Sequence, residues 1–471
     1  MDCLFCLIIL CTACFLYCIK HYLRAVYLAL NLPGPPALPI LGNVLLLNNE
    51  KRLVELGISA SQLYGSLARC WISIIPFFWI YEPKHLKLIL PGKNSQKNIF
   101  YKLLHNFIGK GLITNNGMTW KTHRKLIQPY FHISVLENYI NVFCDNTQDL
   151  LNSLEENKDI KITPFINKCI LSILHNTILG VCLDDDKESP YRKGEVILKE
   201  RITKPWLLIE TIFKYTPFAK TEEIQKLTLH NYTKKILLRR RDGIQKAPCQ
   251  NLLDMLIEIS ENNHDFTDED IINEAVTFML AGQDSVGAAV AFTLYYVAKH
   301  EEVQSRIAKE LEEVLESDRP TVTELCNMKY LQQCIKESLR LAPSVPIISR
   351  VLTEDVVLDG HTLPAGTNIF ISPFITHRLP HYFPNPSTFD PDRFSEENVD
   401  KRHPFSFIPF SAGQRNCIGY KFALLEIKTI LAGVLRRFQI NLVPGHEDLE
   451  FSYRTTLRAK GGIWLRLNAR K

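Results

Sequence analysis

The residues best suited to chemistry lie in one short stretch, Phe410-Ser-Ala-Gly-Gln-Arg-Asn-Cys-Ile-Gly419. Cys417 stands in a loop punctuated by Gly413 and Gly419, and Arg415 comes two residues before it. A thiolate is a strong ligand for iron, and on a haem iron it raises the electron density in a way that favours O–O cleavage. We expect the two glycines to permit close backbone approach. Arg415 can offer a bidentate cation to a carboxylate such as a haem propionate.

A second candidate lies at residues 281–285, Ala-Gly-Gln-Asp-Ser, in the middle of a helix predicted over about 268–299. A helix of that length rises roughly 48 Å, enough to cross a domain. Gly282 is expected to weaken the helix and leave a groove. Asp284 and Ser285 are an acid and a hydroxyl, which are suited to relaying protons.

Two further spacings place reactive groups on one helix face. Trp120 and Arg124 are four residues apart, so an indole N–H and a guanidinium could both meet one carboxylate. Glu337 and Arg340 are three residues apart and can pair. Each spacing is common by itself: the first is typical of a surface Trp–Arg stack and the second of a solvated ion pair.

In chain order, these motifs resemble those of the cytochrome P450 superfamily, the haem-thiolate monooxygenases. The resemblance runs from a proline-rich segment near the N-terminus to the final strands. The segments around Trp120 and Asp284 resemble the family 4 branch, which includes fatty-acid ω-hydroxylases and many insect enzymes. The resemblance implies a mainly α cytochrome P450 fold, with a long central helix over haem b and small β-sheets.

The resemblance also implies roles for individual residues. Cys417 would be the axial iron ligand, and Asp284 and Ser285 would deliver protons to dioxygen. Glu337, Arg340 and Arg393 would form a buried structural network behind the haem loop. The residues expected to contact the haem are Trp120, Arg124, Arg350, Phe410, Gly413, Arg415, Cys417 and Gly419.

The activity implied is insertion of one oxygen atom from dioxygen into a C–H bond of an apolar substrate, such as a fatty acid, terpenoid or xenobiotic. The electrons would come from NADPH through the flavoprotein NADPH-cytochrome P450 reductase. Two alternatives are a haem-thiolate isomerase or dehydratase of peroxides that needs no reductase, and a non-enzymatic haem-binding or gas-sensing protein. The intact pair of Asp284 and Ser285 favours dioxygen activation over the isomerase.

One position departs from the family 4 pattern. Many members carry a glutamate just before the glycine of the central helix, and it can form an ester with a haem methyl group. Ala281 occupies that position here. Because a methyl side chain offers no carboxylate, we expect the haem to be held without a covalent bond.

The N-terminal residues predict a membrane anchor. Residues 3–19 carry no charge and are nearly all apolar, and Lys20, His21 and Arg24 follow them. This charge order puts the catalytic domain on the cytoplasmic side, and the resemblance implies the endoplasmic reticulum. A cleaved signal peptide is the alternative. The predicted organisation is an anchor at 1–30, a proline-rich hinge at 31–43 and a monooxygenase domain at 44–471.

Composition sets broader limits. The chain has 471 residues and a net charge of +5, which is too mild to indicate a nucleic-acid partner. Its 13 cysteines are scattered, as is typical of a reducing compartment. We expect the reductase to dock on a positive face around the cysteine loop. The residues proposed for that face are Lys121, Lys125, Arg402, Lys421 and Lys428.

Short strands are predicted in two regions. Residues 70–81 are rich in β-branched and aromatic residues and predict a hairpin, with Pro76 near its turn or at an edge. Residues 351–372 alternate in character, and Asp359 with Gly360 marks a turn between strands. In the family, Val345, Ile347 and Ile348 would face the substrate.

Overall fold

The long central helix organises the fold. The computed structural model describes residues 2–92, 95–182, 189–193, 201, 204–244, 250–453 and 455–470. Helix α14 spans Asp268–Lys299, as predicted, and begins with a capping box in which Thr267 and Asp270 satisfy each other's backbone N–H groups. Among the described helices, α14 is long and apolar enough to cross a membrane, but 67% of its most apolar window is buried. It is therefore the core helix of the protein.

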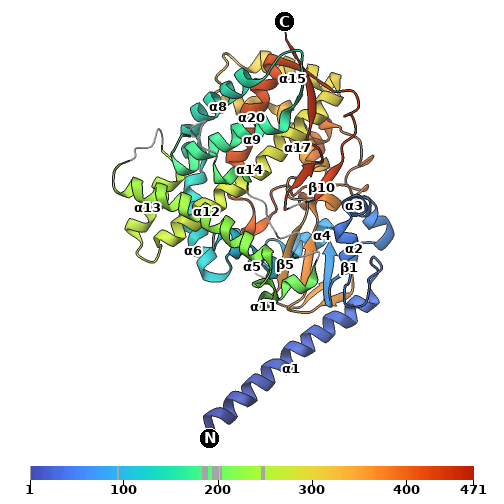
Figure 1. Ribbon diagram of the computed structural model, residues 1–471. Helices are drawn as coiled ribbons and strands as arrows, with labels where there is room; N and C mark the ends of the chain where they lie inside the picture. Colours follow the sequence, from blue (N-terminus) through green and yellow to red (C-terminus); the bar gives the residue numbers. More distant parts are fainter. Residues whose placement is uncertain are drawn as a thin grey trace.

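Other helices surround α14 on several sides (Figure 1). They are α9 (Ile162–Leu174), α12 (Pro217–Arg241), α13 (Leu252–Asn262), α17 (Lys329–Leu341) and α20 (Tyr420–Arg437). At Gly282 an added Cβ would lie 2.8 Å from Leu174 Cδ2 of α9. Helix α14 runs through this position without interruption, and the glycine allows close packing of α9. The expected weakening of the helix at Gly282 stays a prediction.

A five-stranded sheet lies beside the helical part, in the order β1-β2-β8-β5-β3. Its strands are β1 (Leu67–Ile72), β2 (Ile75–Ile80), β3 (Ser95–Gln96), β5 (Ile348–Leu352) and β8 (Asn368–Ile371). Strands β1 and β2 form the predicted hairpin, and Pro76 pairs with Trp71 next to the turn. Strand β8 runs parallel to β2, whereas the other pairs are antiparallel.

Three smaller sheets complete the β structure. One joins β4 (Asp159–Lys161), β12 (Trp464–Ala469) and β9 (Phe438–Leu442), and the hairpins are β6 (Val356–Leu358) with β7 (His361–Leu363) and β10 (Phe451–Tyr453) with β11 (Leu457–Ala459). The predicted turn between β6 and β7 is confirmed: Asp359 and Gly360 both have positive φ, 45° and 81°.

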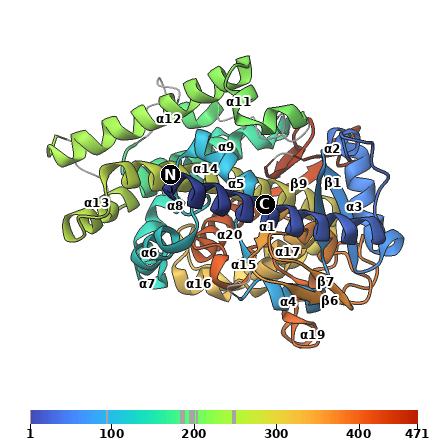
Figure 2. The same ribbon diagram turned by 90° about the horizontal axis from the view of Figure 1, so that it is seen from below.

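The remaining α-helices frame these two parts. Seen from below, α12 and α13 lie on one side of the molecule, and α2 and α3 with β1 lie on the other (Figure 2). The helices are α2 (Val44–Asn48), α3 (Glu50–Tyr64), α4 (Pro83–Ile89), α5 (Ile99–Ile108), α6 (Gly117–Ile127), α7 (Ile133–Leu136), α8 (Ile140–Ser153), α11 (Glu210–Phe213), α15 (Glu301–Val314), α16 (Val322–Asn327), α18 (Pro373–Thr376) and α19 (Glu396–Val399).

Helix α1 (Asp2–Asn31) projects away from the body of the protein (Figure 1). Apolar side chains along its projecting part are exposed, and Phe5, Leu10 and Phe15 are each more than 60% exposed. Its last turns pack on the body, where Ala29 is buried and the Tyr22 hydroxyl donates to Ile74 O at 3.0 Å.

The proline-rich segment that follows α1 is attached to the sheet. The helix ends before Pro33, as expected for a residue that cannot continue it. Arg69 N–H of β1 donates to Pro33 O at 2.8 Å, and Asn43 Nδ2 donates to Pro36 O at 2.7 Å. The segment therefore does not act as a free extended spacer, because the backbone of β1 holds it in place.

Candidate active site

The cysteine loop is held by its own backbone. Cys417 N–H donates to Phe410 O at 2.9 Å, which closes the loop at the two ends of the motif. Gly413 has a φ of +73°, and a Cβ there would lie 2.1 Å from Leu90 O. A side chain at this position would therefore clash with the backbone of Leu90 and Pro91. The close approach expected at Gly413 is therefore present, and it sets the loop against the end of α4.

Gly419 differs from Gly413 in both its backbone conformation and its surroundings. Its φ is −90°, and an added Cβ would lie 3.6 Å from the Phe131 ring, an ordinary van der Waals distance. Among the described protein atoms, the expectation of close approach at Gly419 was wrong. Its backbone N–H instead hydrogen-bonds the Cys417 sulfur. Desolvation raises the pKa of the Cys417 thiol, while this N–H and the nearby Arg124 cation lower it.

The side chain of Cys417 is accessible, which a metal ligand requires. Cys70, Cys144, Cys169 and Cys334 are buried instead. In the described part of the chain, no group of three or more His, Cys, Asp or Glu residues could hold a metal ion. An accessible thiol that belongs to no such group of described residues therefore suits a metal that brings its other ligands with it, as iron in a porphyrin does.

Arg415 and Trp120 form one unit across the loop and α6. The guanidinium carbon of Arg415 lies 3.6 Å from the Trp120 ring centroid, in a cation–π contact. Arg415 also donates to Asn115 O at 2.8 Å and to Asn116 Oδ1 at 3.0 Å. The partners of Arg415 were not found from the sequence, because the asparagines lie 300 residues away with no motif of their own.

Arg124 contacts the cysteine loop directly. Its guanidinium donates to Asn416 O at 3.0 Å and to Asn416 Oδ1 at 2.8 Å, so two hydrogen bonds hold the residue before the cysteine. The preceding residue, His123, hydrogen-bonds the buried Glu274 of α14 at 2.8 Å. Helix α6 is thus fixed to the central helix by one side chain and to the loop by the next.

Arg415 also belongs to a cluster of three cations, together with Lys97 and Arg350. Removal from water lowers the pKa of Lys97, and the charges of Arg350 and Arg415 lower it further. Burial lowers the pKa of Arg415, and Arg350 adds to the effect. Arg350 is 2% exposed. Among the residues that the structure describes, no carboxylate pairs with any of the three cations.

Three mutually repelling cations in a space with little water fit an anionic ligand. A haem carries two propionates, and Arg415 belongs to the same loop as the accessible Cys417. The residues present therefore fit a haem whose iron meets the thiolate and whose propionates meet the cations. Lys97 was not predicted from the sequence, because a single lysine before a helix carries no motif.

Asp284 and Ser285 are adjacent on α14 and have different partners. The Ser285 hydroxyl donates to Ala281 O at 2.7 Å, one turn back along the helix. The Asp284 carboxylate forms an ion pair with Arg458 of β11. Asp284 remains 43% exposed, so its carboxylate can still exchange protons. Arg458 was missed from the sequence because it lies 174 residues from Asp284.

Glu337 and Arg340 form a bidentate pair with no solvent exposure, with N–O distances of 2.7 and 2.8 Å. Arg393 approaches the same carboxylate at 3.5 Å. The network continues through His377, whose carbonyl accepts from Arg340 at 3.1 Å. The ring of His377 accepts the Ile408 N–H at 2.8 Å, so the network reaches the segment that leads into the cysteine loop.

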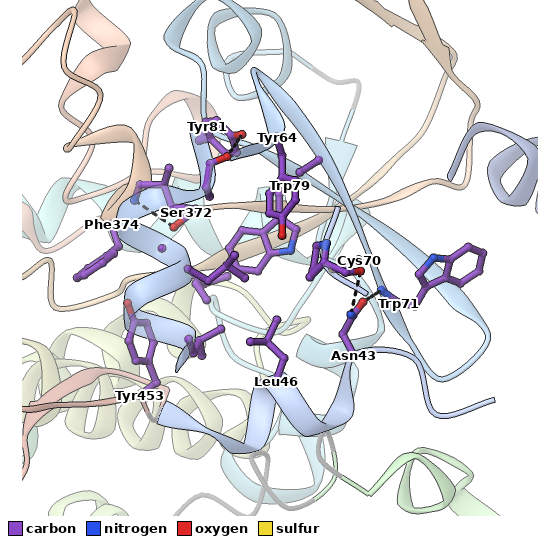
Figure 3. Close-up of a pocket in the computed structure, with 18 residues that line it drawn as sticks. Asn43, Leu46, Tyr64, Cys70, Trp71, Trp79, Tyr81, Ser372, Phe374 and Tyr453 are labelled. Carbon is purple, nitrogen blue, oxygen red and sulfur yellow. Dashed lines mark hydrogen bonds between the residues drawn. The ribbon is translucent and has the colours of Figure 1, made fainter. Parts of the chain in front are cut away.

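An apolar pocket lies elsewhere, between the proline-rich segment, α3, β1 and β2 (Figure 3). Ile347 lines it together with Phe374 and Tyr453, and no residue of α14 or of the cysteine loop does. Its volume of about 30 Å³ holds roughly one or two water molecules. The pocket is therefore separate from the cysteine loop. Ile348, also expected to face substrate, is buried in the sheet core.

One of the cations proposed for a docking face, Lys428, is not available, and Arg402 is half-buried. Lys428 is 3% exposed, and its ammonium donates to Leu325 O at 2.6 Å. Burial lowers its pKa to about 8. Arg402 packs over the Phe383 and Phe394 rings. The prediction was wrong for Lys428, because burial of a helix face does not show in a count of charges.

The fit to a porphyrin iron held by one thiolate places the chain among the haem-thiolate proteins. A family model described as Cytochrome P450 matches residues 32–465. The chain is 47% identical to probable cytochrome P450 4aa1 of Drosophila melanogaster, over 96% of this chain and 92% of that protein. It is 34% identical to cytochrome P450 4c3 of the same fly, over 96% and 91% of the two chains. It is 35% identical to cytochrome P450 4V2 of Homo sapiens, over 92% and 89%.

The chain belongs to the cytochrome P450 family, and the predicted resemblance to its family 4 branch is confirmed. It is a haem-thiolate monooxygenase with haem b as its cofactor, rather than an isomerase or a gas sensor. Enzymes of this family work with a redox partner on apolar substrates, and family 4 members are generally membrane-bound.

The contrast between the two loop glycines gives a matched pair of variants. Gly413→Ala places a Cβ against Leu90 O in a residue with a positive φ. The backbone strain alone costs about 1–3 kcal/mol. We expect a clear loss of unfolding free energy and of bound haem. Gly419→Ala meets only ordinary contact and should stay close to wild type in urea unfolding. Equal losses in both variants would contradict the geometry of the loop.

His377 makes the network sensitive to acid. Burial lowers its pKa to about 3, whereas an unfolded histidine titrates near ~6.5. The unfolded chain therefore binds the extra proton first, and stability falls as the pH drops from about 6.5 toward 3. His377→Gln keeps an acceptor for Ile408 N–H but cannot titrate. In urea unfolding at several pH values, the free energy of unfolding should fall less steeply with decreasing pH in this variant than in wild type. A change at the exposed His381, His381→Gln, is the control. An unchanged pH dependence in His377→Gln would contradict this role.

Proposed function

We propose that the Cys417 thiolate is the axial ligand of the haem iron in this monooxygenase. The observation that carries the proposal is an accessible thiol on the same loop as Arg415, which clusters with Lys97 and Arg350. Among the described residues, no carboxylate pairs with these three cations. When bound, the haem supplies the iron centre that activates dioxygen. Arg415, Arg350 and Lys97 would hold its propionates, and the Trp120 ring, stacked on the planar Arg415 guanidinium, would keep that guanidinium in place. Arg124 supports the loop through Asn416.

Replacement of the ligand tests this assignment. Cys417→Ala should abolish the thiolate-type absorbance of the reduced carbon monoxide complex, because no sulfur then faces the iron. The matched control is Cys326→Ala, which removes another accessible cysteine, on α16. That variant should keep the spectrum. A normal thiolate spectrum in Cys417→Ala would show that another residue binds the iron.

We propose that Asp284 and Ser285 move the protons that the reaction consumes. The accessible carboxylate of Asp284 can exchange protons with solvent, and Ser285 follows it directly on the central helix. The Ser285 hydroxyl already donates to Ala281 O, which leaves its oxygen free to accept a further hydrogen bond. These are positions from which a carboxylate can take up a proton and a hydroxyl can pass one on.

Removal of the acid tests the relay. Asp284→Asn keeps the size of the side chain but cannot carry a proton, and a positioned acid–base group is worth about 10²–10⁴ in rate. We expect product formation to slow by a factor in this range, while the haem content stays normal. Ser285→Ala should divert electrons to hydrogen peroxide. Unchanged rate and coupling in both variants would remove the pair from the mechanism.

Ala281 supports a haem held only by ligation and ion pairs. Its side chain is a methyl group on the helix that carries Asp284, so it offers no carboxylate for an ester with the haem. The same small residue does not tie the haem edge to the central helix, and for this reason terminal-carbon selectivity does not follow from family 4 membership.

We infer that electrons reach the site from NADPH through NADPH-cytochrome P450 reductase, an acidic flavoprotein. The cations that remain available for its docking are Lys121 and Lys125, which are exposed on α6, the half-buried Lys421 on α20, and the half-buried Arg402. Both helices contact or follow the cysteine loop, so a partner bound there would approach the proximal side of the haem. The substrate is an apolar molecule such as a fatty acid, terpenoid or xenobiotic.

Salt tests this docking face, because exposed charges are screened within about 8–10 Å at moderate ionic strength. Reduction by the reductase should slow as salt rises. At every salt concentration, the reductase should reduce the double variant Lys121→Gln/Lys125→Gln no faster than wild type. The rate for the variant should also depend less on salt. Lys309→Gln, an exposed change on α15, is the control. A wild-type rate that is independent of salt would contradict electrostatic docking.

We propose that residues 1–30 anchor the enzyme in the endoplasmic reticulum membrane, with the catalytic domain in the cytoplasm. The exposed apolar side chains of α1 and its projection from the body support this role (Figure 1). Residues 31–43 then connect the anchor to the monooxygenase domain, 44–471. The docking of this segment on β1 would limit how far the domain can tilt relative to the membrane.

A further inference from the structure

The acid of the central helix is held from outside that helix. Arg458 lies on β11, and its Nη2 contacts Asp284 Oδ1 in an ion pair. The two side chains are 20% and 43% exposed, so water has only partial access to the pair. A guanidinium in this position fixes where the carboxylate points, and charge-assisted hydrogen bonds of this kind are the strong ones.

A second link joins the same hairpin to the next residue of the helix. Leu457, directly before Arg458, donates its N–H to Ser344 O at 2.9 Å. Ser344 in turn donates its hydroxyl to Ser285 O at 2.7 Å. The β10–β11 hairpin is thus connected to Asp284 by a side chain and to Ser285 through Ser344.

The helix leaves room for this arrangement one turn beyond the acid. At Gly287 an added Cβ would lie 3.8 Å from Arg458 Nη1 and 2.7 Å from Asn167 Oδ1 of α9. Asn167 Oδ1 is buried and has no hydrogen-bond partner among the residues that the structure describes. A glycine here lets the guanidinium and the asparagine approach the helix from two neighbouring elements. The surroundings of the helix next to Asp284 therefore include two polar side chains, Arg458 and Asn167.

We propose that Arg458 and Ser344 are positioning residues for proton delivery: Arg458 sets the orientation of the Asp284 carboxylate, and Ser344 sets the peptide of Ser285. The proposal rests on the proposed relay role of Asp284 and Ser285. Ser344 precedes the segment 345–348, whose Ile347 lines the apolar pocket of Figure 3.

The balance of the reaction defines what correct positioning achieves. Productive turnover uses one dioxygen, two electrons from NADPH and two protons; one oxygen enters the substrate C–H bond and the other leaves as water. The unproductive route uses the same electrons and protons but returns both oxygens as hydrogen peroxide. A misplaced acid delivers the second proton late, and the peroxide route gains. Arg458 and Ser344 thus control coupling, the product formed per NADPH consumed.

The first test compares variants of Arg458. Arg458→Met removes the ion pair at similar length, and Arg458→Lys keeps the charge. Lys460→Met, a change at an exposed neighbour that pairs with the exposed Glu450, is the control. We expect Arg458→Met to lower coupling by about tenfold, the effect of one charge-assisted hydrogen bond. It should also raise the solvent deuterium isotope effect on product formation. Arg458→Lys should restore most of the coupling, and Lys460→Met should match wild type.

Holoenzyme content and the reduced carbon monoxide spectrum identify variants that fail through folding. Coupling is measured only on the fraction that keeps this spectrum, so a partly unstable variant still answers the question. For Ser344, the matched pair is Ser344→Ala, which should lower coupling, and Ser344→Thr, which keeps the hydroxyl and should not. Wild-type coupling and isotope effect in spectrally normal Arg458→Met and Ser344→Ala would overturn the proposal.

A double-mutant cycle separates this proposal from the relay itself. If Arg458 acts through Asp284, Asp284→Asn/Arg458→Met should be no less coupled than Asp284→Asn alone. Additive losses would mean that Arg458 acts elsewhere and would overturn the positioning role. If Asp284→Asn alone had no effect, the proposed relay would fail. A loss in Asp284→Asn with none in Arg458→Met would leave the relay standing and reject Arg458.

Discussion

The fold depends on one buried charge pair that must be satisfied on every side. Glu337 and Arg340 have no solvent exposure, and an unpaired charge at such a site costs several kcal/mol. Arg340 therefore also donates to the carbonyl oxygens of His377, Pro386 and Thr388. These bonds fix the irregular chain between β8 and the cysteine loop, where regular secondary structure is sparse. The polar network thus helps to set the position of the loop, together with the apolar packing of Phe410 and Ile418.

The haem site applies the opposite rule. Behind the loop the charges neutralise each other, whereas in front of it Lys97, Arg350 and Arg415 remain without a carboxylate among the described residues. Such a cluster costs free energy until an anion binds. Haem binding at the proposed site would offset this cost, because its two carboxylates would pair with the cations. The central helix on the other side carries an acid that is held by Arg458, so that both faces of the site are organised by guanidinium groups.

Much of this could be predicted from the sequence because the information is local. The central helix, the hairpin at β1 and β2, and the pairing of Glu337 with Arg340 follow from periodicity, caps and spacing. The contacts that complete the site could not. Lys97, His377 and Arg458 come from distant segments and stand in no motif, so only the tertiary fold brings them to the site. Burial cannot be read from the sequence either. For that reason Lys428 was predicted to be a surface charge, whereas its side chain is buried on α20.

The central claim is that one thiolate holds the iron in a loop built for it. The most direct measurement is the iron X-ray absorption fine structure of the purified resting enzyme, which counts the sulfur atoms bonded to the metal. One sulfur scatterer, together with the porphyrin nitrogens, is the result that this account predicts. Iron with only nitrogen and oxygen neighbours, in an enzyme that still turns over, would contradict it.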